Sequence, residues 1–150
     1  MNGRRVVVTG IGAITPIGNN LKDYWESLVK GVSGAAPITN FDASKFKTQF
    51  ACEVKGFDVK DFIDKKEARK LDKFSQYALT VAKEAIEDSK IDTTTINPER
   101  AGVIWGSGIG GMETFFTESV DYGVGNGTPR FNPFFIPVSY THLRAHETES

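Results

Sequence analysis

The sequence predicts an α/β protein. Two short apolar runs, at residues 4–9 and 101–105, have the β-branched content and the flanking glycines of buried strands. Three longer segments, at 21–30, 65–89 and 112–121, place apolar residues three and four positions apart, as amphipathic helices do. The resulting order of strand, helix, helix, strand and helix is typical of an α/β domain.

The overall composition excludes several classes of protein. Lys and Arg number 18 against 19 Asp and Glu, a net charge of -1 that argues against a nucleic-acid-binding surface. No apolar run approaches the roughly 18 residues of a membrane span. The single cysteine excludes a disulfide scaffold. The apolar run near the N-terminus is broken at Gly10 and Pro16 without a cleavage site, so we expect a cytoplasmic protein.

The first helix has clear boundary signals. Asn19 or Asn20 can cap a helix over residues 21–30, because a short polar side chain there satisfies a free backbone N–H. Gly31 is a suitable residue to end it. Its apolar face comprises Leu21, Trp25, Leu28 and Val29.

The middle of the chain is predicted to be irregular and then helical. Residues 32–60 show only short extended pieces near 38–41 and 50–54. One long helix is expected over 65–89. Its beginning carries a group of cations, called here the basic cluster: Lys65, Lys66, Arg69 and Lys70. Such a group usually forms a surface exposed to solvent, and it could also bind an acidic partner.

A glycine-rich turn leads into the last predicted helix. Gly106, Gly108 and Gly111 match the G-x-G-x-x-G pattern that can hold a pyrophosphate between a strand and a helix. That pattern also requires an acidic residue about 20 positions further on, and Asp121 comes too early. We therefore favour glycines that allow tight turns and close backbone approach, and keep a nucleotide-binding domain as the alternative.

The cysteine and the two histidines could in principle act as a nucleophile or as metal ligands, but the residues around them do not support such roles. Cys52 lies in an alternating segment beside Glu53, so we expect a packed or half-buried cysteine rather than a nucleophile. His142 and His146 have the spacing of helical metal ligands but no evident third ligand, so no metal site is predicted. Residues 138–150 show little apolar periodicity and no capped element.

Six segments, taken in order over residues 2–137, resemble one family of enzymes. They are Arg4–Gly12, Trp25, Phe41–Asp42, Lys66–Asp72, Gly106–Gly111 and Pro133–Pro137. Together they are similar to the N-terminal part of a β-ketoacyl-[acyl-carrier-protein] synthase II, an elongating condensing enzyme of the thiolase superfamily. The resemblance implies the N-terminal portion of a thiolase-like α/β fold with an incomplete sheet. Residues 138–150 resemble nothing in the family, and we expect a spurious tail on a truncated fragment.

The resemblance also implies a chemistry. Such synthases move an acyl chain from its carrier protein onto a cysteine thiolate, and two histidines assist decarboxylation of malonyl carrier protein. The family needs no metal or nucleotide cofactor and forms a homodimer at full length. The cysteine and both histidines are expected beyond residue 137. We therefore assign no catalytic residue in this chain and expect it to be inactive alone.

Some binding roles follow from the same resemblance. Ile109 and Phe134 would help to line the acyl-chain pocket near the dimer interface. Acyl carrier protein, which is acidic, would face Lys66, Arg69, Lys70 and Arg130. No nucleic-acid or membrane partner is expected. The alternative to a condensing enzyme is a non-catalytic paralogue that binds carrier protein.

Overall fold

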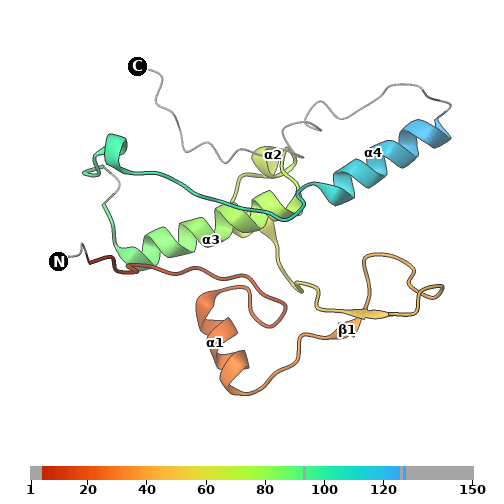
Figure 1. The fold of residues 1–150 in the computed structure, drawn as a ribbon, viewed down its shortest axis with the longest axis horizontal. Helices are drawn as coiled ribbons and strands as arrows, with labels where there is room; N and C mark the ends of the chain where they lie inside the picture. Colours follow the sequence, from red (N-terminus) through yellow and green to blue (C-terminus); the bar gives the residue numbers. More distant parts are fainter. Residues whose placement is uncertain (1–4, 93, 126, 128–150) are drawn as a thin grey trace. The chain divides into compact units, whose positions relative to one another are not determined.

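The computed structural model describes residues 5–92, 94–125 and 127 (Figure 1). The chain divides into two compact units. The first unit contains the chain up to Asp58 together with Val81–Ile91. The second contains Val59–Thr80 and the chain from Asp92 onward. Among the described residues, no helix has both the length and the apolar character that crossing a membrane requires.

The first unit contains helix α1 (Leu21–Val29), which confirms the first predicted helix. Asn20 is its N-cap, and the side-chain oxygen accepts a hydrogen bond of 2.8 Å from the backbone N–H of Asp23. The structure therefore selects Asn20 over Asn19 as the capping residue. Gly31 follows the helix with a φ of +65°, a left-handed conformation that glycine adopts without steric cost.

A short antiparallel sheet follows in the same unit. Strand β1 (Ala36–Pro37) pairs with strand β2 (Phe50–Ala51), so the extended piece near 50–54 is confirmed at its start. The piece expected near 38–41 is displaced toward the N-terminus. Its backbone N–H groups at Thr39 and Asn40 donate instead to the carboxylate of Glu53, which takes the place of a strand partner.

The prediction of two longer strands is wrong. Residues 5–9 and 101–105 form no strand in the structure. Val6 is 91% exposed and Ile104 is 99% exposed, where burial was expected. A strand requires a neighbour that pairs with its backbone groups, and the described part of the chain supplies none for these two segments.

The N-terminal segment is held by carboxylates of helix α3 (Lys73–Ser89) instead of by a sheet. The backbone N–H of Ile11 donates to Asp88 at 3.0 Å. Glu84 accepts two such bonds, from the N–H of Ala13 at 2.8 Å and from that of Leu21 at 2.7 Å. The second bond satisfies a free N–H in the first turn of α1. Glu84 thus joins α1 to the second half of α3.

Two glycines allow the N-terminal segment to approach α3 this closely. A Cβ at Gly12 would lie 2.1 Å from the carbonyl oxygen of Val81, and one at Gly10 would lie 2.1 Å from that of Ala85. Both distances are far below van der Waals contact, and both obstacles are helix backbone. At these positions, therefore, glycine is what permits close backbone approach.

The single long helix predicted over 65–89 is two helices. Helix α2 (Lys65–Ala68) ends before α3 begins at Lys73. The side-chain amide of Gln76 donates at 3.0 Å to the last carbonyl of α2 and to that of Leu71. The backbone carbonyl of Asp72 accepts the N–H of Gln76 and starts α3. Asp72 thus lies just before the helix, where Asp is favoured over helix interiors.

The last predicted helix is confirmed. Helix α4 (Met112–Val124) follows Gly111, whose φ of +70° suits glycine, and it extends slightly past the predicted end at residue 121. Two short 3-10 turns, η1 (Val59–Asp61) and η2 (Pro98–Arg100), also belong to the second unit.

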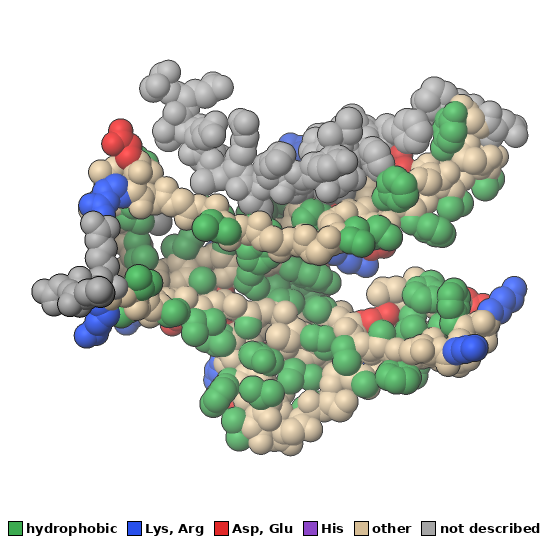
Figure 2. Space-filling view, in the orientation of Figure 1, with side chains coloured by type: hydrophobic (Ala, Val, Ile, Leu, Met, Phe, Trp, Pro, Cys, Tyr) green, Lys and Arg blue, Asp and Glu red, His purple; other side chains and the backbone are tan. Residues whose placement is uncertain are grey.

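Large apolar side chains are not gathered into a core in the described residues. The buried hydrophobic residues there are all alanine: Ala43, Ala68 and Ala78. Larger side chains such as Trp25, at 62% exposed, remain at the surface. Figure 2 shows apolar side chains distributed over the face that it displays. The two units therefore present apolar surface that a complete domain would bury.

Candidate functional site

The basic cluster lies on α2 and on the segment that follows it, not on the first turns of α3. Lys65, Lys66 and Arg69 are exposed and make no ion pair within the part of the chain that the structure describes. Lys70 differs, because its Nζ lies 2.6 Å from Oε1 of Glu67. The structure thus brings the four cations together, and three of them keep their charge available to an acidic partner.

Several of the candidate residues lie outside the part of the chain that the structure describes. They are Arg130, Phe134, His142 and His146. The expected roles of Arg130 in carrier-protein binding and of Phe134 in the acyl pocket therefore stay predictions. The same holds for the expectation that the two histidines bind no metal.

Ile109 lies on the glycine-rich turn of residues 106–111, which leads into α4. Its side chain is 73% exposed. The residues described by the structure do not enclose it in a pocket. Its expected place in an acyl-chain pocket therefore needs apolar surface from other parts of the protein, and stays a prediction.

The C-terminal end of the glycine-rich turn packs against α3. A Cβ at Gly110 would lie 2.7 Å from Cζ of Phe74, so the turn's backbone lies directly against this aromatic ring. Gly111 is buried and has a φ of +70°, a conformation that L side chains rarely adopt. A Cβ at Gly106 or Gly108, in contrast, would have no atom of the described part of the chain within 4 Å. Among the described residues, the turn is thus held at its C-terminal end.

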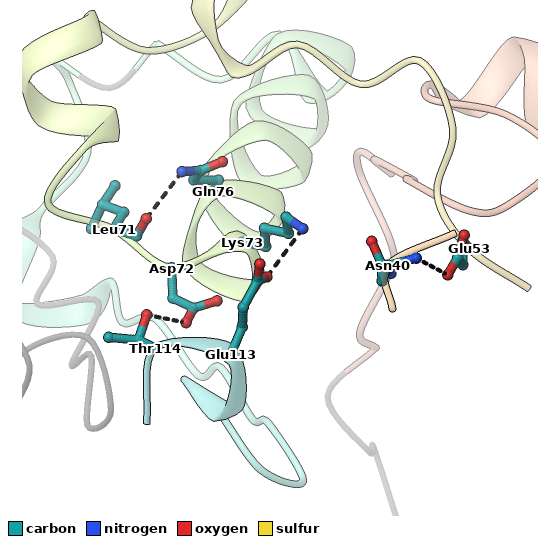
Figure 3. Close-up of polar contacts among 8 residues, drawn as sticks. All are labelled: Asn40, Glu53, Leu71, Asp72, Lys73, Gln76, Glu113 and Thr114. Atoms are coloured by element: carbon teal, nitrogen blue, oxygen red, sulfur yellow. Dashed lines mark hydrogen bonds and ion pairs between the residues drawn. The ribbon is translucent and has the colours of Figure 1, made fainter. Parts of the chain in front are cut away.

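Two polar contacts hold the first turn of α4 to the start of α3 (Figure 3). Oγ1 of Thr114 donates to Oδ2 of Asp72 at 2.8 Å, across 42 residues of sequence. Nζ of Lys73 lies 3.0 Å from Oε2 of Glu113. The hydrogen bond with Glu113 raises the pKa of Lys73, although partial burial opposes the shift. We call these four residues the α3–α4 clamp. No local sequence pattern predicted it.

A cavity of about 340 Å³ lies beside the clamp. Carboxylates, hydroxyls, an amide and the Lys73 ammonium make up most of its lining, and Leu71 is its main apolar contributor. Acyl chains require predominantly apolar pockets. We therefore assign the acyl chain no place in this cavity.

Cys52 is exposed, so the expectation of a packed cysteine is wrong. Strand β2 ends one residue earlier, at Ala51, so Cys52 lies outside the short sheet. The adjacent Glu53 accepts a hydrogen bond of 2.6 Å from Oγ1 of Thr39, which lowers the pKa of Glu53. The Glu53 carboxylate therefore holds the segment around Thr39 in place. Among the described residues, no catalytic arrangement forms around Cys52.

The geometry does not favour the nucleotide-binding alternative. A G-x-G-x-x-G turn holds a pyrophosphate when it joins a strand to a helix. Here the segment before the turn is not a strand. Within the described ranges, no group of three or more His, Cys, Asp or Glu side chains could hold a metal ion.

Comparisons with known proteins identify the family. The family described as "Beta-ketoacyl synthase, N-terminal domain" matches residues 3–139. The chain is 46% identical over 135 residues to 3-oxoacyl-[acyl-carrier-protein] synthase 2 of Staphylococcus aureus (strain COL), covering 90% of this chain and 32% of that protein. The chain therefore spans about a third of the length of the curated relatives that it matches.

Solved structures agree with the sequence match. The ishigamide ketosynthase/chain length factor superposes with a TM-score of 0.81 at 28% identity, covering 91% of this chain and 34% of that one. AntDE:AntF, a type II PKS acyl-carrier protein in complex with its ketosynthase, gives a TM-score of 0.70 at 26% identity. The match covers 89% of this chain and 36% of that one. The predicted thiolase-like α/β fold, present as its N-terminal portion, is thereby confirmed. The chain belongs to the β-ketoacyl synthase family, as part of its N-terminal domain.

Proposed function

We propose that this chain is the N-terminal part of a 3-oxoacyl-[acyl-carrier-protein] synthase, an acyltransferase of fatty-acid elongation. The observation that carries the proposal is the family match over residues 3–139. The 46% identity to a protein named as such a synthase supports the same activity. The family match ends at residue 139, and we place the end of the synthase portion of this chain near that residue.

The proposed reaction has two halves. A cysteine thiolate attacks the acyl thioester of a carrier protein, so that a new carbon–sulfur bond forms and the old one breaks. The carrier sulfur leaves as a thiolate and takes up a proton from solvent. Malonyl carrier protein then loses CO₂, and the electron pair of the broken bond attacks the acyl carbon. The cysteine thiolate leaves, and the product is a 3-oxoacyl carrier protein that is two carbons longer. The cysteine and two histidines lie beyond residue 137 of the full-length synthase, so this chain alone is inactive.

This chain contributes binding surfaces to that reaction. The basic cluster and Arg130 receive the acidic carrier protein, and Ile109 and Phe134 face the acyl chain. Support comes from the three exposed cations of the cluster and from the AntDE:AntF complex, in which a related ketosynthase holds an acyl-carrier protein. The full-length synthase is a cytoplasmic homodimer and uses no cofactor.

Charge reversal in the basic cluster tests the carrier-protein surface. In the full-length synthase, Lys66→Glu combined with Arg69→Glu should raise KM for acyl carrier protein about tenfold at low salt, because like charges then face the partner. Added salt should shrink the effect, and kcat should not change. Steady-state kinetics at two ionic strengths measure this.

A matched control exists in the first unit. Lys45→Glu combined with Lys47→Glu makes the same change of charge at two exposed lysines outside the cluster. This variant should keep the KM of the unmodified enzyme. If the cluster variant also keeps it at low salt, the cluster is not the carrier-protein surface.

The activity itself is tested on the full-length synthase, the product of the source gene read past codon 137. Incubation with a carrier protein that bears an acyl thioester and with malonyl carrier protein should release one CO₂ for each 3-oxoacyl product. Binding of carrier protein without CO₂ release would instead indicate a non-catalytic paralogue, the alternative that the basic cluster alone would allow. Binding of NAD(P) would revive the nucleotide-binding alternative.

A further inference from the structure

We propose that Asp72, Phe74 and Thr114 are positioning residues that fix the glycine-rich turn and, through it, set how strictly the enzyme selects acyl-chain length. The inference rests on the proposed function, because only there does Ile109 contact the acyl chain. It assigns a role to contacts that the proposed reaction does not use.

The turn is supported from one side. Ile109 immediately precedes Gly110, whose backbone lies against the ring of Phe74. At the earlier glycines of the turn, Gly106 and Gly108, a Cβ would meet no atom within 4 Å among the described residues. Of these three glycines, it is thus Gly110, the residue bonded to Ile109, that packs against α3.

A continuous set of contacts links Asp72 to the turn. The backbone carbonyl of Asp72 accepts N–H groups in the first turn of α3, which holds this residue in place. Its carboxylate accepts the hydroxyl of Thr114 at 2.8 Å and so holds the first turn of α4. In that turn, the N–H of Phe115 donates to the carbonyl of Gly111 at 2.8 Å. Gly111 is bonded to Gly110, so a shift of α4 would carry Ile109 with it.

The Asp72–Thr114 hydrogen bond stabilises the α3–α4 clamp more than the Lys73–Glu113 ion pair does. The side chains of Lys73 and Glu113 are 52% and 66% exposed, so water and salt screen their attraction. The Asp72–Thr114 bond is part-buried and has an ionised acceptor, which makes it stronger than a bond between neutral groups. Removing the Thr114 hydroxyl should therefore release the turn, whereas neutralising Glu113 should not.

The test compares acyl-chain preference in variants of the full-length synthase. Thr114→Val removes the hydroxyl while keeping the shape of the side chain. The substrates are carrier proteins loaded with acyl chains of different lengths. The ratio of kcat/KM between the best and the poorest of these substrates should fall about fivefold, because a released turn no longer holds Ile109 in one position. The KM for malonyl carrier protein should not change. Partial unfolding would lower all rates equally and would leave the ratio intact.

Two further variants control this result. Thr114→Ser restores the hydroxyl and should restore the ratio, and Glu113→Gln should leave it unchanged. If Thr114→Val does not fold, Asp72→Asn, which removes the charge of the acceptor, should produce a smaller fall in the ratio.

The outcomes separate this inference from the proposed function. An active enzyme in which Thr114→Val or Asp72→Asn keeps the full ratio overturns the positioning role alone. A full-length protein that forms no 3-oxoacyl product overturns the proposed function, and the positioning role is lost with it.

Discussion

The isolated 150-residue chain is expected to show no cooperative thermal transition. The buried hydrophobic residues among those described are alanines, whereas Val6 and Ile104 are almost fully exposed. A large apolar side chain contributes about 1.5–3 kcal/mol only when it is buried, so these residues add little to the free energy of unfolding. Scanning calorimetry of the isolated chain measures this directly.

The full-length synthase is the control for this experiment. It should melt cooperatively, because the additional chain supplies partners for the exposed segments. A sharp transition of the isolated chain, with equal calorimetric and van't Hoff enthalpies, would show that the two units form a stable domain alone. That result would favour a natural short paralogue.

Replacing Gly12 by Ala should strongly destabilise the full-length synthase. The new Cβ would lie 2.1 Å from the carbonyl oxygen of Val81, and helix backbone cannot rotate away as a side chain can. The N-terminal segment would have to move from α3, which would also break the bond between Ala13 and Glu84. Overpacking of this kind typically costs about 1–3 kcal/mol, and we expect the upper end of this range. Urea denaturation gives the free energy of unfolding.

Gly123→Ala provides the matched control. This glycine lies inside α4, and a Cβ there meets no atom of the described residues within 4 Å. Alanine is the better helix former, so the control should be neutral or slightly more stable. A Gly12→Ala variant with the denaturation midpoint of the unmodified enzyme would contradict the close approach to α3.

Elements with local signals could be predicted from the sequence. Asn20 and Gly31 mark the ends of α1 through the chemistry of capping, which depends on only a few neighbouring residues. The helical spacing after Gly111 predicts α4 in the same way. The basic cluster is also local, because its members lie within a single short stretch of sequence.

Elements that depend on distant partners could not be predicted. Residues 5–9 and 101–105 have the composition of strands, but a strand forms only where another strand pairs with it. The Asp72–Thr114 bond joins residues 42 positions apart, and no periodicity reveals it. The pairing of Lys70 with Glu67 differs, because their i, i+3 spacing was a visible signal.

We propose that this chain is the first third of a condensing enzyme, since it covers 32% of a relative named as a 3-oxoacyl-[acyl-carrier-protein] synthase. Long-read sequencing of the source DNA through codon 137 tests it most directly. We expect the reading frame to continue to a cysteine at a strand-to-helix turn, followed further on by two histidines. A frame that runs through Ser150 to a stop codon in independent reads would contradict this claim, because the residues that perform the chemistry would then be absent.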